Sequence, residues 1–125
     1  MVRARIALIG LVRHLADVER IWFRQVMAGQ DAPPHFWSTA DRDAGFHGAV
    51  ADPEIVAQAW RLWRAEIAFA EQVVADAPEL DVIGRGSQRG QISLRWVLVH
   101  MVEEYARHNG HADLLRERID SAVGE

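Results

Sequence analysis

Residues 93–117 read Ser-Leu-Arg-Trp-Val-Leu-Val-His-Met-Val-Glu-Glu-Tyr-Ala-Arg-His-Asn-Gly-His-Ala-Asp-Leu-Leu-Arg-Glu, and this stretch decides the fold. Most of its residues favour a helix, Ser93 is a candidate N-cap, and the predicted helix runs to about residue 122. Each residue of an α-helix advances about 100° around the axis, so His100, His111, Glu104 and His108 fall at about 0°, 20°, 40° and 80°. Four possible ligand side chains therefore share one narrow side of the helix.

Two further helices are predicted upstream. The first runs from about residue 4 to residue 27, because its apolar residues recur with a period near 3.6, and Gly29 is a plausible terminator. The second has Asp52 as its N-cap and Pro53 at its first position, which together form a strong start signal. Pro78 ends it. Gly110 interrupts the last helix, and a glycine inside a helix destabilises it by about 1 kcal/mol relative to Ala. We therefore expect that this glycine serves close packing or access to a site, or that it marks a kink.

Two loops separate these helices. Residues 30–51 are long for a connection within a helical bundle, and the aromatic residues among them favour a loop that is packed rather than disordered. His35 and His47 in this loop are interpreted as plain surface residues. The glycine-rich segment 84–87 is not a phosphate loop, because it lacks the Gly-Lys-Ser/Thr ending and a preceding strand. The whole pattern predicts an all-α fold with three long helices and a long first loop.

Composition narrows the class of protein. The chain has 125 residues, which suits one domain over residues 1–125, and its formal net charge is −4. No basic block is present, which argues against nucleic acid as a partner. No segment is long and apolar enough to cross a membrane, and there is no convincing signal peptide, so we expect a cytoplasmic protein without a membrane partner. Cysteine is absent, so any thiol chemistry needs a thiol from outside.

The strongest candidate for chemistry is a metal site. Glu104 and His108 are four residues apart, so their side chains are neighbours on the helix. His14 is the best candidate for a third ligand, because it lies between the apolar residues Leu11 and Leu15 and is expected to face inward. Two His and one carboxylate, with positions left open, are typical of catalytic metal sites. The alternatives remain a hydrogen-bonded core histidine and a solvated contact between the Glu and His side chains.

Two segments resemble a known family. Residues 9–24 read Ile-Gly-Leu-Val-Arg-His-Leu-Ala-Asp-Val-Glu-Arg-Ile-Trp-Phe-Arg and resemble the segment of the DinB-like family that carries its first metal histidine. Residues 93–117 are similar to the last bundle helix of that family. The similarity is to the actinobacterial branch, which is related to the N-terminal domain of mycothiol-dependent maleylpyruvate isomerase. It covers nearly the whole chain and implies a helical bundle that binds a metal between its helices.

The resemblance also implies site residues. Carried over by position, the metal ligands are His14, Glu104 and His108, and the metal is divalent, zinc being favoured and nickel or iron being alternatives. Many relatives have His where Glu104 stands. His111 occupies a position that is often Gln in the wider family, and we interpret it as a substrate contact rather than a further ligand. His100 is expected to pack or to support the ligands.

The activity implied by the resemblance is that of a metal-dependent S-transferase. The metal would lower the pKa of a low-molecular-weight thiol of the mycothiol type, and the thiolate would attack a small electrophile. Arg107 and Arg116 are candidate binders for a carboxylate of the thiol, although surface ion pairs with neighbouring acids are favoured for both. The alternatives are a non-catalytic metal-binding or stress-response bundle that acts through dimerisation, and an accessory module that pairs with another polypeptide.

One departure from the family concerns the fold. The first bundle helix of the DinB-like family normally precedes the first metal histidine, and this sequence begins where the linker into the second helix would lie. Three helices would leave an apolar groove where the fourth belongs, and such a surface favours a partner. We therefore expect a homodimer, with a start site placed too far downstream or a decayed family member as alternatives.

Overall fold

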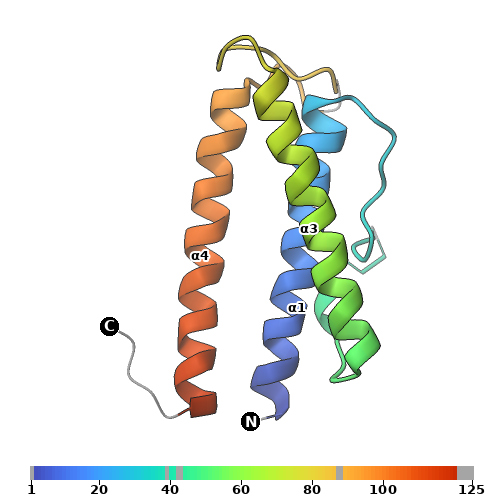
Figure 1. The fold of residues 1–125 in the computed structure, drawn as a ribbon, viewed down its shortest axis with the longest axis vertical. Helices are drawn as coiled ribbons and strands as arrows, with labels where there is room; N and C mark the ends of the chain where they lie inside the picture. The colour runs from blue at the N-terminus through green and yellow to red at the C-terminus, as the bar shows by residue number, and fades with distance from the viewer. Residues whose placement is uncertain (1, 39, 42–43, 87–88, 121–125) are drawn as a thin grey trace.

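The computed structural model describes residues 2–38, 40–41, 44–86 and 89–120, and it is all-α, as predicted. Helix α1 (Val2–Glu19) continues directly into a π-helical segment, η1 (Arg20–Met27). A short helix α2 (Ala44–His47) and two long helices, α3 (Pro53–Asp76) and α4 (Leu94–Asp120), follow. The three long helices lie side by side, and α1 packs against both α3 and α4 (Figure 1).

The predicted helix ends are confirmed by their caps. The Asp52 carboxylate accepts a hydrogen bond from the Glu54 backbone N–H at 2.8 Å, and the Ser93 hydroxyl accepts one from the Trp96 N–H at 3.1 Å. Gly29 has a φ of 68°, a left-handed conformation that glycine adopts without steric cost, and it follows the end of η1. Short local signals therefore set where these helices begin and end.

Three details differ from the sequence-based expectation, and the first is the short helix α2 within the predicted loop 30–51. Residues 20–27 were predicted as the last turns of an α-helix but form a π-helix, which the apolar spacing alone does not distinguish. Helix α4 continues through Gly110, and a methyl group added there would meet nothing within 4 Å. No packing contact among the described residues therefore accounts for this glycine. The predicted end near residue 122 lies outside the described residues.

The main core lies where η1 meets the start of α4. Its buried members come from α1, η1, α3 and α4, and they are Val18, Phe23, Val26, Met27, Ala70, Leu94, Val97 and Met101. The loop between α3 and α4 covers this end, because the Arg85 and Gly86 N–H groups donate to the carbonyls of Met27 and Val26 at 3.1 and 2.9 Å. A Cβ on Gly86 would lie 2.4 Å from a backbone oxygen, so this close approach requires glycine.

The long loop 30–51 is packed, as its aromatic residues predicted. The buried carboxylate of Asp17 accepts hydrogen bonds from the backbone N–H groups of His35, Phe36 and Trp37 at 2.6, 3.0 and 2.8 Å. Arg13 donates to the Gly48 carbonyl at 2.6 Å. Two polar residues of α1 therefore hold the loop against that helix.

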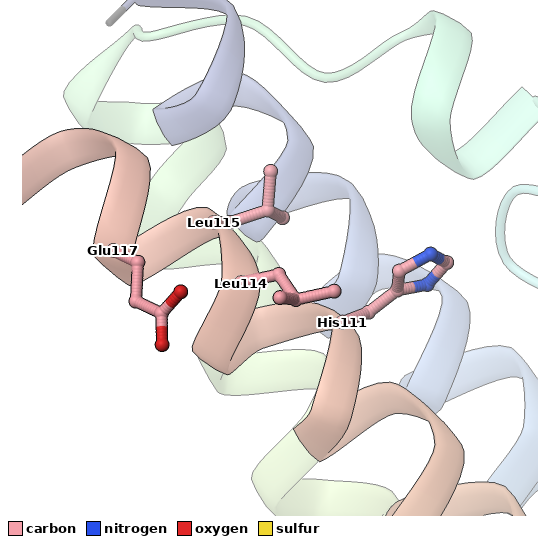
Figure 2. Close-up of a pocket in the computed structure, with 4 residues that line it drawn as sticks. All are labelled: His111, Leu114, Leu115 and Glu117. Atoms are coloured by element: carbon pink, nitrogen blue, oxygen red, sulfur yellow. The ribbon is translucent and has the colours of Figure 1, made fainter. Parts of the chain in front are cut away.

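Several hollows lie along α4, and two of them bear on function. On the side toward α3, an apolar groove of about 610 Å³ is lined by residues of both helices, including Ile67, Val74, Met101 and Val102. The Val102 side chain is 70% exposed, so the apolar surface expected between the helices is present. A second hollow of about 480 Å³, lined by His111, Leu114, Leu115 and Glu117, lies in the last turns of α4; Leu115 projects toward α1 (Figure 2).

Candidate metal centre

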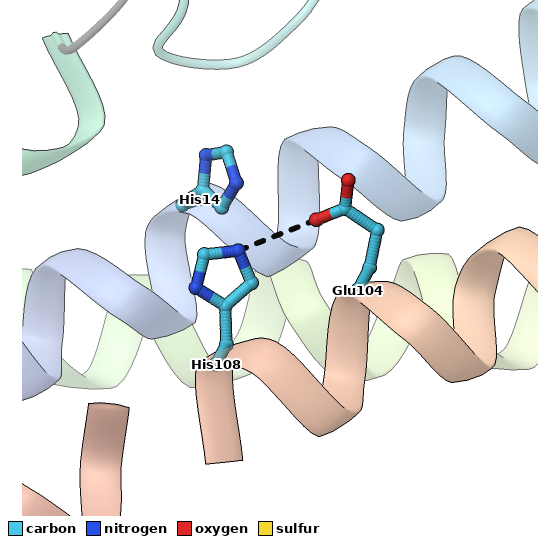
Figure 3. Close-up of side chains that lie close together, drawn as sticks. All are labelled: His14, Glu104 and His108. Atoms are coloured by element: carbon cyan, nitrogen blue, oxygen red, sulfur yellow. Dashed lines mark ion pairs between the residues drawn. The ribbon is translucent and has the colours of Figure 1, made fainter. Parts of the chain in front are cut away.

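The structure brings together the three residues that the sequence singled out as ligands. His14 comes from α1, and Glu104 and His108 come from neighbouring turns of α4 (Figure 3). One ligand atom from each lies within 4.8 Å of the other two, and all three residues are partly buried. Helices α1 and α4 are in contact, and this contact places residue 14 beside residues that are about ninety positions away in the sequence.

Glu104 is at the centre of this group. Its Oε2 lies 3.3 Å from Nε2 of His108, and its Oε1 lies 3.3 Å from Nε2 of His100. Arg107 approaches Oε1 at 3.7 Å from the solvent side. The outer carboxylate oxygen therefore faces His100 and Arg107, whereas the inner oxygen faces His108.

The protonation of His108 suits a ligand. Burial lowers the pKa of this imidazole, and the nearby Glu104 carboxylate only partly offsets the effect. The ring is therefore mostly neutral near pH 7, with a lone pair available on one nitrogen. Its Nδ1 is buried and has no hydrogen-bond partner among the described residues. Two imidazoles and one carboxylate are a donor set that fits zinc, nickel or iron.

The loop covers the other face of His14. The His14 ring lies 4.7 Å from the His108 ring in an edge-on arrangement and 5.6 Å from the ring of Phe46. Phe46 belongs to the short helix α2, and Gly45 of the same helix is buried. A Cβ placed on Gly45 would lie 3.6 Å from the backbone nitrogen of His14, so this helix packs closely against α1. Aromatic and small residues of the loop thus limit access of water to this side.

The comparisons with known proteins identify the family. A family model described as mycothiol-S-transferase matches residues 1–121. The chain belongs to the mycothiol S-transferase family. This agrees with the resemblance to the DinB-like family found in the sequence. Neither a curated protein nor a solved structure matches the chain. Among the described residues of this family member, no helix has the length and apolar character of a membrane span.

The predicted substrate contacts of this family member lie beside the three clustered residues. The His111 ring is 6.4 Å from the His108 ring and borders the hollow in Figure 2. The Arg107 side chain is 62% exposed next to Glu104, so it can still reach a ligand. Arg116 forms an ion pair with Asp113 at 3.1 Å on the surface, as the sequence analysis favoured.

A second ionic cluster was missed by the sequence analysis. Glu66 of α3 is 2% exposed, and Arg20, Arg24 and His35 lie 3.0, 2.6 and 3.1 Å from its oxygens. His35 lies at the surface, as interpreted from the sequence, but its imidazole is only 22% exposed and contacts this buried acid. His47 lies in α2, but its side chain is outside the described part. The overlooked signal was an acid within the apolar stripe of Ala59, Trp63 and Ala70.

A buried hydrogen-bond chain was also missed. The Trp63 indole donates to the Tyr105 hydroxyl at 3.0 Å, and this hydroxyl donates to Oε1 of Glu19 at 2.8 Å. Glu19 is 4% exposed, and burial raises the pKa of its carboxyl group to about 7. Its position among Ala16, Phe23 and other apolar residues of the first helix was the available signal.

Proposed function

We propose that the protein is a metal-dependent S-transferase that joins a mycothiol-type thiol to a small electrophile. The observation that supports this most directly is the convergence of His14, Glu104 and His108 in a chain of the mycothiol S-transferase family. Family membership supports the thiol, and the donor set supports a divalent metal, zinc being favoured over nickel or iron.

The three residues would hold the metal, and each has its own task. His14 and His108 supply nitrogen donors, and Glu104 supplies one negative charge. A divalent metal bound there supplies Lewis acidity, which lowers the pKa of a thiol so that it reacts as a thiolate near neutral pH. The charge of Glu104 makes such a site milder than one with three imidazoles. The Phe46 ring beside His14 excludes water from one side.

The electrophile would lie in the hollow beside His111, whose ring is 6.4 Å from that of His108. Leu114 and Leu115 supply apolar surface, and His111 supplies a polar group at the end nearer the metal ligands. Arg107 can bind an anionic group at the solvent side. In the reaction, the thiol loses its S–H proton to solvent and the sulfur forms a bond to the electrophilic carbon. The leaving group departs with the electron pair of the broken bond.

The test is elemental analysis followed by a conjugation assay. Mildly purified protein should contain about one equivalent of a divalent metal per chain. Mycothiol and monochlorobimane mixed with this protein should form the adduct faster than without it, and removal of the metal with a chelator should abolish the difference. A metal-free protein, or adduct formation at the uncatalysed rate, would contradict the proposal.

We also propose that two chains associate through the groove between α3 and α4. The chain exposes 7985 Å², whereas a folded monomer of this mass exposes about 6,700 Å². The excess exceeds the roughly 800 Å² that a standard interface covers on each partner. Val102 and Val74 in this groove are 70% and 40% exposed. Sedimentation equilibrium should give a dimer that Val102→Glu dissociates, and a compact wild-type monomer would contradict association through this groove.

The cytoplasmic location stays a prediction.

A further inference from the structure

An aromatic cluster lies beside the candidate metal centre and adjoins it through His100. Trp22 comes from η1, and Trp96 and His100 come from neighbouring turns of α4. The Trp96 and His100 rings are stacked, with centroids 5.0 Å apart and an interplanar angle of 10°. Trp22 lies 5.2 Å from Trp96 and 4.8 Å from His100. Three rings from two segments thus form one continuous aromatic surface.

This cluster begins at one of the candidate ligands. Nε2 of His100 lies 3.3 Å from Oε1 of Glu104, so the imidazole contacts both the carboxylate and the indole of Trp96. Trp96, His100 and Glu104 are each four residues apart, so they follow one side of α4 over about 12 Å of helix. A ligand that lies along this side would reach from the aromatic surface to the metal centre.

The cluster is open to solvent mainly at Trp96, because Trp22 packs against the core and the His100 side chain is only 22% exposed. The Trp96 side chain is 48% exposed, whereas its neighbour Val97 is fully buried in the core. The guanidinium group of Arg89 lies over the Trp22 ring at 5.0 Å and adds a hydrogen-bond donor at the edge. An exposed aromatic face carries partial negative charge, which attracts the weakly positive C–H groups of a saturated ring, while nearby donors bind its hydroxyl groups.

We propose that Trp22, Trp96 and His100 form the subsite for the sugar-like rings of the thiol. Mycothiol consists of a cysteine unit joined to two six-membered polyhydroxylated rings, and such rings suit an aromatic surface with polar edges. With the rings on this surface, the cysteine unit extends toward Glu104 and His108. This inference rests on the proposed function, because it takes the thiol to be of the mycothiol type.

The experiment measures binding by calorimetry with three probes: mycothiol, N-acetylcysteine as a thiol without the rings, and the ring pair without cysteine. Trp96→Leu should weaken the binding of mycothiol and of the ring pair about tenfold, because it removes the stacking surface. Binding of N-acetylcysteine should be unchanged. Trp96→Phe, which keeps an aromatic face, should retain most of the affinity and also guards against a folding defect in the leucine variant.

Trp60 provides the matched control. It is 41% exposed, lies on α3 and contacts Trp63 edge-on, so Trp60→Leu removes a similar indole elsewhere and should leave all three affinities unchanged. Equal mycothiol affinity in Trp96→Leu and wild type, an equal loss in Trp60→Leu, or no binding of the ring pair by wild type would overturn the subsite. Ring-pair binding that depends on Trp96 without any S-transfer would leave the subsite standing and refute only the proposed function.

Discussion

Glu104 and Glu66 are both carboxylates held between helices beside a histidine, yet their surroundings differ in charge. Glu66 is surrounded by Arg20, Arg24 and His35, which occupy both of its oxygens, so its charge is already neutralised by the protein. The inner oxygen of Glu104 faces His108, an imidazole that burial keeps mostly neutral, and His14 lies close by. A cation is therefore redundant at Glu66 and is electrostatically favourable at Glu104. Glu104 also has an arginine nearby, but Arg107 is 62% exposed and lies 3.7 Å from the other oxygen, Oε1. The difference teaches that a carboxylate beside a histidine indicates a metal where no buried arginine has taken the place of the cation.

The largest expected effect is on metal content, and it tests this comparison directly. His108→Ala should reduce the metal from about one equivalent to almost none, because two of three protein ligands do not retain it at micromolar concentration. His35→Ala is the matched control, since it removes a histidine beside the other carboxylate and should leave the metal in place. Mass spectrometry of the dialysed proteins measures both. Equal metal in both variants would mean that the comparison is wrong.

The second effect is on stability at the saturated cluster. Glu66→Gln leaves Arg20 and Arg24 without a countercharge and should lower the free energy of unfolding by about 3–5 kcal/mol near neutral pH. Burial by itself would raise the pKa of Glu66, but hydrogen bonds from Arg24, His35 and Arg20 lower it overall. The stability that its charge provides is thus present above about pH 4.5 and is lost as the pH falls. Urea unfolding of metal-free protein should show a difference that shrinks toward pH 3.

The third effect has the opposite dependence on pH. Because burial raises the pKa of Glu19 to about 7, its ionisation costs the folded state up to about 3 kcal/mol as the pH rises from 4.5 to 7. Glu19→Gln keeps an acceptor for Tyr105 and should therefore be more stable than wild type at pH 8 and equally stable below pH 4.5. Urea unfolding curves at pH 8 and at pH 4 measure the difference in the free energy of unfolding between the variant and wild type. Greater stability of the wild type at pH 8 would place an unrecognised cation beside Glu19.

The smallest effect concerns the support of Glu104. His100→Ala removes the group that faces Oε1 and should weaken metal binding about tenfold to a hundredfold without abolishing it. Arg107→Gln is the control for charge near the same oxygen and should change metal affinity only about twofold, because this side chain is largely exposed. Competition with a chromophoric chelator gives both constants. An equal change in the two variants would indicate a general electrostatic effect rather than positioning.

The sequence by itself determined the local features. The caps Asp52 and Ser93 and the terminator Gly29 are read from a few neighbouring residues, because the hydrogen bonds and the left-handed conformation involved are local. The helical period likewise places His100, Glu104 and His108 along one side of α4 without any knowledge of the remaining chain.

Only the tertiary structure decided which helices supply each cluster. The approach of His14 to His108, the contact of His35 with Glu66 and the hydrogen bond from Tyr105 to Glu19 join residues far apart in the chain. Such contacts depend on how one helix is rotated against the next, and neither periodicity nor caps fix that rotation. Apolar spacing also does not distinguish a π-helix from an α-helix, so the shape of residues 20–27 was set by packing rather than by a local signal.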